Sequence, residues 1–138
     1  MLTITAENKK LSKIDENSLH SLCEKVYYGE NVDKKRIVDL IFCTEQTIKR
    51  LNRDYRGKDN VTDVLSFSFD DSDYLGEIYI CVSRAGEQRK KYGLTLDEEM
   101  QRLFIHGLFH LLGFDHETQE ERLIMERYEK KYIDFEKE

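Results

Sequence analysis

The segment TLDEEMQRLFIHGLFHLLGFDH, residues 95–116, is the most informative part of this chain. Thr95 and Glu98 have the T-x-x-E spacing of a capping box, in which the two side chains cap the start of a helix. Apolar or small residues then recur at helical spacing and predict one buried face: Met100, Leu103, Phe104, Gly107, Leu108 and Leu111. Gly113 follows where glycine commonly ends a helix in the left-handed conformation. The segment therefore predicts a long, partly buried helix and then a turn.

Three of the four histidines lie in this segment, at His106, His110 and His116. Residues four apart share one face of a helix, so His106 and His110 can point at a common atom. A turn at Gly113 can bring His116 to the same place. Three neutral imidazoles around one ion leave a coordination position open, which is the arrangement of catalytic zinc sites. The spacing predicts a metal site at the end of this helix.

Gly107 separates this pattern from the metzincin proteases, which share its histidine and glycine spacing as H-E-x-x-H-x-x-G-x-x-H. Those enzymes use the glutamate after the first histidine as the base that activates water. Without it, peptide hydrolysis by that mechanism is not expected. Glycine inside a helix costs about 1 kcal/mol relative to alanine, which indicates that a core element or a substrate approaches the backbone. Asp115 is a candidate for orienting an imidazole or a metal-bound water.

The rest of the chain alternates between strand and helix signals. Strands are predicted at residues 2–6, 36–44, 64–69 and 76–82, with a polar turn at residues 70–73. Helices are predicted after the caps Asp15, Thr44, Ser83, Thr95 and Thr118, the first ending at Gly29 and the third at Gly93. The last helix is expected to bury Ile124, Tyr128, Tyr132 and Phe135. Together these signals predict one α+β domain over residues 1–138, a mixed sheet of about four strands packed by about five helices.

Composition limits the classes of function. The chain has 138 residues and a formal net charge of −6, which taken alone argues against a polyanionic partner. Basic residues nevertheless cluster in two segments: Lys49, Arg50, Arg53, Arg56 and Lys58, and then Arg84, Arg89, Lys90 and Lys91. Cys23, Cys43 and Cys81 stand in apolar surroundings and are expected to be buried thiols. No apolar run approaches the ~20 residues of a membrane span, and no signal-peptide pattern is visible, so a cytoplasmic protein is expected.

Read as a motif, His-Gly-x-Leu-His-Leu-x-Gly-Phe-Asp-His resembles the signature of the YbeY-type family of bacterial single-strand-specific endoribonucleases and ribosomal RNA maturation factors. A second block agrees, LNRDYRGKD at residues 51–59 followed by TDVLSF at residues 62–67. A third, LGEI at residues 75–78, also looks like the family. Val61 and Ser68 stand where the family often has proline.

The resemblance implies a site and a set of partners. His106, His110 and His116 would bind one Zn²⁺, for which another divalent transition metal such as Ni²⁺ can substitute in a purified sample. Arg56 and His106 would be catalytic. For Arg56 the physical reason is that a guanidinium matches phosphate oxygens and stabilises charge that develops on them. Arg53, Lys58 and the segment from Arg84 to Lys91 are candidate phosphate contacts. The implied partners are ribosomal RNA and small ribosomal subunit proteins, with neither DNA nor a membrane.

Three functions remain open from the sequence. The first is a metal-dependent endoribonuclease that cleaves single-stranded ribosomal RNA during maturation and ribosome quality control. The second is a non-catalytic, zinc-containing ribosome-assembly factor that only binds RNA, and the third is a zinc hydrolase of another substrate. The general base is not evident, although Asp115 and a metal hydroxide are candidates.

Overall fold

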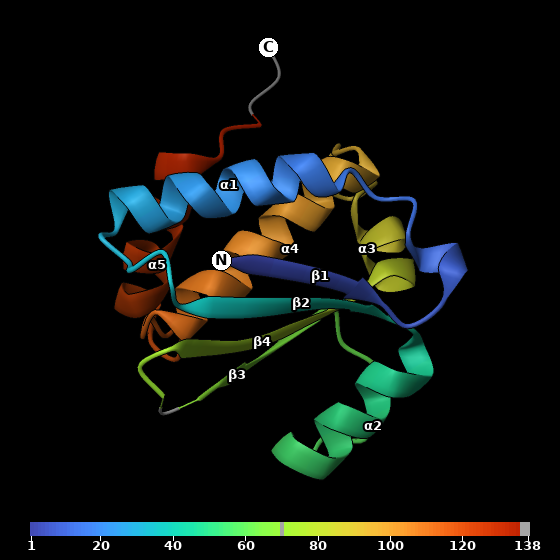
Figure 1. Cartoon of the computed structure of the whole chain (residues 1–138). Helices are drawn as coiled ribbons and strands as arrows, with labels where there is room; N and C mark the ends of the chain where they lie inside the picture. Colours follow the sequence, from blue (N-terminus) through green and yellow to red (C-terminus); the bar gives the residue numbers. More distant parts are fainter. Residues whose placement is uncertain (70, 136–138) are drawn as a thin grey trace.

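A computed structural model describes residues 1–69 and 71–135 of the chain, and within them it contains one sheet of four strands and five α-helices (Figure 1). The strands are β1 (Leu2–Ala6), β2 (Ile37–Cys43), β3 (Val64–Ser68) and β4 (Tyr74–Cys81). The helices are α1 (Glu16–Gly29), α2 (Glu45–Arg56), α3 (Val82–Gln88), α4 (Leu96–Leu111) and α5 (Gln119–Tyr132), and a short 3₁₀ helix (Lys9–Leu11) precedes α1. Asp70, which belongs to the predicted turn at residues 70–73, lies outside the described residues, as do residues 136–138.

The sheet is mixed, as predicted, with the strand order β1-β2-β4-β3. β2 pairs in parallel with β1 and with β4, whereas β3 pairs with β4 in the antiparallel direction. Side chains alternate between the two faces of a strand. Leu40 and its cross-strand partner Ile78 are fully buried on one face, while Asp39 and Glu77 lie opposite each other on the other face. The strand order places β1 and β3 at the two edges of the sheet.

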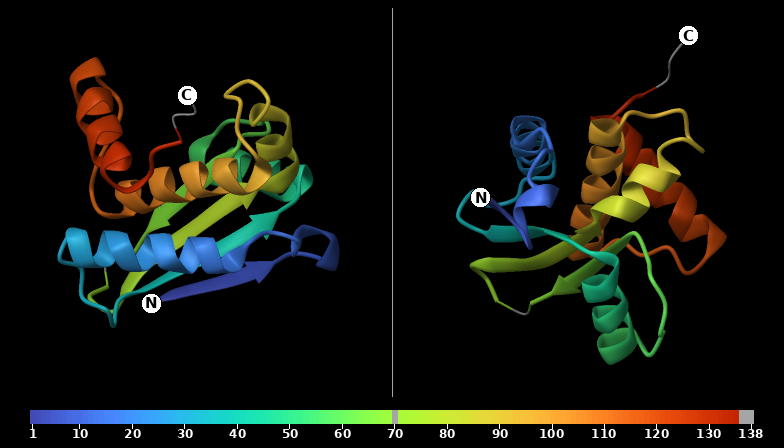
Figure 2. Two further views of the ribbon diagram at one scale, coloured as in Figure 1. Left: turned by 90° about the horizontal axis from the view of Figure 1, so that it is seen from above. Right: turned by 90° about the vertical axis from the view of Figure 1, so that its right-hand side faces the viewer.

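Helices cover the two faces unequally. α1 and α4 lie over one face and α2 over the other (Figures 1 and 2). Helix α4 packs against β3 and β4 through the face that its sequence predicted, which is entirely buried. A Cβ atom at Gly107 would lie 2.8 Å from Cγ2 of Ile78 and 2.9 Å from Oγ of Ser66. The sequence indicated that either a core element or a substrate approaches the backbone at Gly107. The structure shows that it is a core element, the sheet, and glycine permits this close approach of helix and sheet.

Four of the five predicted helix caps are confirmed. The side chains of Asp15, Thr44, Thr95 and Thr118 each accept a hydrogen bond from a backbone N–H in the first turn of their helices. The helices that begin after Thr95 and Thr118 both have complete capping boxes. These side chains satisfy N–H groups that would otherwise have no partner within the helix.

The predicted cap Ser83 is wrong. Helix α3 begins at Val82, and its N-cap residue Cys81 makes no side-chain capping bond. The reason is that β4 runs directly into α3, so no loop residue separates them. The helix also ends at Gln88, and Gly93 instead takes a positive φ of 66° in the turn that follows.

The predicted buried face of the last helix is wrong by one residue at its start. Ile124 is 41% exposed, whereas Met125 is 2% exposed and packs in the core. The buried row runs through Met125, Tyr128 and Tyr132, and a residue one position earlier fits the same helical spacing almost as well. Phe135 lies beyond the end of α5 at Tyr132.

A partly buried polar network connects the loop before β3 to α4. Nε2 of Gln88 donates to Oδ2 of Asp63 at 3.1 Å and to Oε2 of Glu99 at 3.1 Å. Glu99 is fully buried and accepts two hydrogen bonds from the guanidinium of Arg102. Because buried charges are costly unless they are paired, this network holds α3, α4 and the loop before β3 in one arrangement.

The described residues include three buried cysteines, as predicted, and all three are free thiols. In the same residues no helix is both long and apolar enough to cross a membrane.

Candidate metal centre

The three histidines of the motif meet at the carboxyl end of α4. His106 and His110 come from the last two turns of the helix, and His116 comes from the loop that follows it. Their ring centroids lie 4.6 to 5.3 Å apart, and one potential ligand atom from each lies within 4.8 Å of the others. The sequence prediction of a converging cluster is confirmed. Among the described residues this is also the one group of three or more potential ligands close enough to hold a metal ion.

The loop after α4 is shaped to return His116 to the helix. Gly113 has a φ of 101°, and its N–H donates to the carbonyl of His110 at 3.0 Å. The ring of Phe114 then packs edge-on against Phe109, with centroids 5.2 Å apart. The Nε–H of Arg122, on α5, donates to the carbonyl of His116 at 3.0 Å. A glycine turn, an aromatic contact and a bond from the next helix therefore fix the position of the third histidine.

Glu129 orients the first histidine, and sequence reasoning missed it. Oε1 of Glu129, on α5, lies 2.8 Å from Nδ1 of His106. This contact leaves Nε2 of His106 to face a metal. A carboxylate on the second nitrogen fixes the tautomer and ring direction of a metal-binding histidine. The one sequence signal was that Glu129 follows Tyr128, at the margin of the buried face. The same helix has several other acidic residues, and the sequence gives no reason to prefer Glu129 among them.

Asp115 has a different partner from the one expected. Its Oδ1 accepts a hydrogen bond from the backbone N–H of His116 at 2.8 Å. That bond stabilises the loop at the residue before the third ligand. The carboxylate that contacts an imidazole is Glu129.

Electrostatics in the cluster favour the form of histidine that binds metals. Burial, and after it the charges of the neighbouring His106 and His116, together lower the pKa of His110 to about 4. His110 is therefore neutral at physiological pH and offers a lone pair. Three imidazoles, one of them oriented by a carboxylate, form a donor set that suits Zn²⁺ and similar divalent ions. The residues present fit a metal centre.

Arg56 ends α2 and reaches the edge of the sheet near this cluster. Its Nη2 donates to the carbonyl of Ser66 at 3.1 Å, and Oγ of Ser66 donates to the carbonyl of Gly107 at 3.3 Å. Gly107 directly follows His106 in the chain. Two hydrogen bonds thus connect the guanidinium to the turn of α4 that carries the first histidine.

The other predicted phosphate contacts lie in different surroundings. Arg53 is exposed and bonds Oδ1 of Asp54 at 2.9 Å, so part of its charge is already paired. Lys58 is exposed just beyond α2. The basic segment from Arg84 to Lys91 lies on α3 and the turn after it, which pack beside the amino-terminal half of α4. The structure does not bring that segment to the histidines, which occupy the opposite end of α4.

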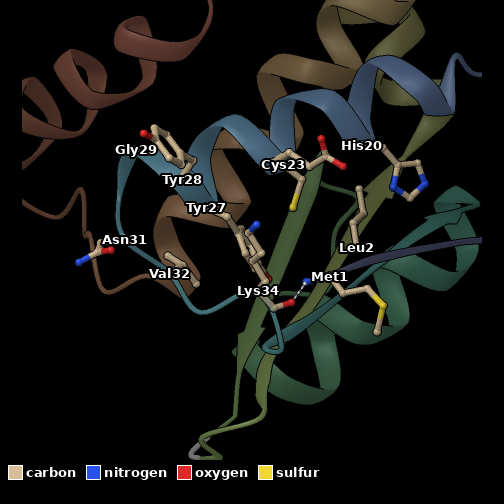
Figure 3. A pocket seen from close by; sticks show the side chains of 11 residues that line it. Met1, Leu2, His20, Cys23, Tyr27, Tyr28, Gly29, Asn31, Val32 and Lys34 are labelled. Carbon is tan, nitrogen blue, oxygen red and sulfur yellow. Dashed lines mark hydrogen bonds between the residues drawn. The ribbon is translucent and has the colours of Figure 1, made fainter.

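A large hollow of about 1180 Å³ lies elsewhere, between α1 and the edge strand β1 (Figure 3). Its lining includes the fourth histidine, His20, together with Cys23 and Tyr27. Burial raises the pKa of the Cys23 thiol to about 12, so this group is not a thiolate at neutral pH. Size alone does not make a catalytic site, and the converging donor groups are at the end of α4. We therefore place the candidate site there.

Fold and site together define a class: an α+β domain with a mixed four-stranded sheet and, where its longest described helix ends, three histidines that could hold a metal ion. Comparison with known proteins identifies the family within this class. The family model described as "Endoribonuclease YbeY" matches residues 3–136, and the chain belongs to this family.

Individual relatives agree with this assignment. A protein named endoribonuclease YbeY from Ureaplasma urealyticum serovar 10 is 48% identical over 99 residues, which are 69% of this chain and 64% of that protein. Its namesake from Ureaplasma parvum serovar 3 is 40% identical over 128 residues, 88% of this chain and 83% of that protein. The solution structure of TM1509 from Thermotoga maritima has a TM-score of 0.64 and 32% identity, and the match covers 96% of this chain and 89% of that one.

Proposed function

We propose that this chain is a metal-dependent endoribonuclease that cleaves single-stranded RNA, with ribosomal RNA as its substrate during maturation and quality control of ribosomes. The observation that carries the proposal is the connection between the two halves of the site. Three histidines that can hold one metal ion lie at the end of α4, and Arg56 is joined to the same turn through Ser66 and Gly107. The relatives named endoribonuclease YbeY support it.

Some residues of the site would bind the metal ion and another would orient a ligand. His106, His110 and His116 would hold the ion, and Glu129 would keep Nε2 of His106 directed at it. A bound Zn²⁺ supplies a Lewis acid for a phosphoryl oxygen and lowers the pKa of water in its open coordination position.

Arg56 would hold the scissile phosphate with its forked guanidinium and stabilise the charge that develops on the phosphoryl oxygens. Lys58 and Arg53 would contact flanking phosphates. The roles of Arg56, Lys58 and Arg53 rest on their charge and on their position along α2 and the segment after it. We place the activity in the cytoplasm, with small ribosomal subunit proteins as partners.

A second candidate, the non-catalytic RNA-binding assembly factor, is favoured by one observation. The two carboxylates of the described residues that contact the site's histidines are both engaged, Glu129 with the ring of His106 and Asp115 with the backbone of His116. One oxygen of each carboxylate is therefore already occupied by a contact within the protein. Binding of RNA without cleavage is the behaviour expected of this candidate.

Single-turnover cleavage of end-labelled single-stranded RNA separates the two candidates. The nuclease should cleave it, stop when a chelator removes the metal, and recover when Zn²⁺ is returned. His106→Ala should lower the rate at least about 100-fold, in the range typical for loss of a group that stabilises the transition state. His20→Ala, in the hollow beside α1, is the matched control and should cleave at the wild-type rate.

Equal cleavage by His106→Ala and the wild type would refute the catalytic metal. Cleavage of a non-nucleotide ester but not of RNA would favour a zinc hydrolase of another substrate. Metal analysis of protein purified without a histidine tag would identify the ion, because a tag can introduce nickel.

A further inference from the structure

Beside Arg56, three aromatic rings form a row across the face of the sheet that α2 covers. Tyr55, on α2, lies edge-on to Phe67, on β3, with ring centroids 5.4 Å apart. Phe67 in turn lies edge-on to Tyr79, on β4, at 5.9 Å. We call Tyr55, Phe67 and Tyr79 the aromatic row. It begins at the outer edge of the sheet and runs inward.

The members of the aromatic row differ in exposure. Tyr79 and Phe67 are partly buried against a small core beneath α2 that contains Ile48 and Leu65. Tyr55 is 71% exposed, although its ring is held from one side by Phe67. Phe67 thus contacts the ring on one side, while most of its surface faces solvent. This is the condition under which an aromatic side chain can stack against a planar group from outside.

Cationic groups border the exposed end of the aromatic row. Arg56 follows Tyr55 directly, and its guanidinium carbon lies 6.0 Å from the centroid of the Phe67 ring. Lys58 is exposed two residues further on. The same Arg56 is bonded to Ser66, whose side chain contacts Gly107 beside the first histidine. A phosphate held by Arg56 would thus lie at the β3 edge, between the histidines on one side of the sheet and the exposed Tyr55 ring on the other.

Acidic groups limit where a polyanion can run on this face. Glu77 lies opposite Phe67 in the sheet register, and Asp39 lies beside Glu77 on β2. Both carboxylates already accept hydrogen bonds from tyrosine hydroxyls. They would repel a phosphate backbone from the middle of the sheet and keep it at the β3 edge, where Tyr55 and Arg56 are.

We propose that the exposed ring of Tyr55 is a stacking site for one base of the single-stranded RNA whose phosphate binds Arg56. The inference rests on the proposed function and adds a base subsite to it. Stacking on an aromatic ring is tolerant of sequence, because every base has a planar face. A duplex hides its bases within its own stack, so this subsite favours single strands.

The test compares a short oligouridylate with an abasic ribose-phosphate backbone of the same length. Dissociation constants for the metal-loaded full chain are measured by fluorescence anisotropy at one salt concentration, and each oligonucleotide is checked for intact length afterwards. Tyr55→Ala should weaken binding of the oligouridylate about 10-fold, within the ~5-fold to 150-fold range for one stacked base. Binding of the abasic backbone should change less than about 2-fold, since it offers phosphates and no base.

Three further variants complete the design. Tyr55→Phe keeps the ring and should bind like the wild type. Tyr55→Leu keeps an apolar contact with Phe67 but offers no planar face, so it should resemble Tyr55→Ala even if the alanine variant folds poorly. Tyr28→Ala, on α1, removes a tyrosine that is 89% exposed and should leave both dissociation constants unchanged.

An equal loss for both oligonucleotides, no loss in Tyr55→Ala, or a loss in Tyr28→Ala as large as that in Tyr55→Ala would overturn the stacking site. A Tyr55→Phe variant as weak as Tyr55→Ala would assign the effect to the hydroxyl and overturn it as well. The binding measurement does not depend on cleavage. RNA that is bound with this pattern but never cleaved would refute the nuclease alone, whereas cleavage without this pattern would refute only the stacking site.

Discussion

Glu129 illustrates how a single residue outside the motif can decide the quality of the metal site. Its carboxylate holds Nδ1 of His106, and a conservative change to glutamine removes the negative charge while keeping the shape. We expect Glu129→Gln to bind Zn²⁺ about 10-fold to 100-fold more weakly, as is usual when an orienting partner of a metal ligand is lost. Competition with a chromophoric chelator measures the change.

Glu126 provides the control for that experiment, since it is an exposed acidic residue on the same helix. Glu126→Gln removes the same charge from α5 and should keep wild-type affinity. If the two variants bound Zn²⁺ equally, long-range charge and not the contact with His106 would be responsible.

Arg56 should be separable from the metal. It contacts Ser66 and does not belong to the donor set, so Arg56→Ala should bind Zn²⁺ like the wild type and cleave RNA about 100-fold to 1000-fold more slowly. Arg56→Lys should recover only part of the rate, because an ammonium lacks the fork of a guanidinium. Metal content and single-turnover rate are measured on the same samples. Loss of metal from Arg56→Ala would instead make the arginine a structural residue.

At the scale of elements, the contact between α4 and the sheet depends on Gly107. Alanine is the better helix former by about 1 kcal/mol, but its Cβ would stand 2.8 Å from Ile78 and 2.9 Å from Ser66. A branched Ile side chain gives way poorly, and overpacking of this kind typically costs ~1–3 kcal/mol. Gly107→Ala should therefore lower the free energy of unfolding by about 1 kcal/mol and weaken RNA cleavage by moving α4 away from β3. Urea unfolding and single-turnover rates measure the two effects.

Gly86 is the matched control on α3. Nothing lies within 4 Å of a Cβ at this position, so Gly86→Ala should gain the helix propensity without a clash and raise stability by about 0.5–1 kcal/mol. Stabilisation by both substitutions would show that α4 has room against the sheet and would remove the packing explanation for Gly107.

The elements that the sequence predicted well are those whose signals are local. Capping boxes at Thr95 and Thr118, and alternation in β3 and β4, depend on residues a few positions apart. The three histidines were predictable for the same reason, since helical spacing and one glycine turn bring them together. The α3 cap failed because β4 enters that helix without a loop, a tertiary arrangement that no local pattern reports.

Interactions across the whole molecule were harder to predict. The contact of Glu129 with His106 joins residues 23 positions apart, and the path from Arg56 through Ser66 to Gly107 joins three separate elements. Neither has a spacing rule, because each depends on how α5 and β3 pack against α4. Family resemblance pointed to Arg56, and the packing explains its place beside the motif.

Because two thiols are buried, the free energy of unfolding of the whole molecule should fall at alkaline pH. Burial raises the pKa of both Cys23 and Cys43 from 9.0 to about 12 in the folded chain. The unfolded chain ionises these thiols near pH 9, so their stabilising effect is complete below about pH 9 and is lost as the pH rises towards about 12. Each thiol should contribute a slope of at most about 1.4 kcal/mol per pH unit in that window.

Urea unfolding midpoints should be level between about pH 7 and 8.5 and then fall. The midpoints of the double variant Cys23→Ala with Cys43→Ala should fall less steeply. A wild-type midpoint that stayed constant to about pH 10.5, or a double variant with the wild-type slope, would show that the thiols ionise as readily in the folded chain as in the unfolded one.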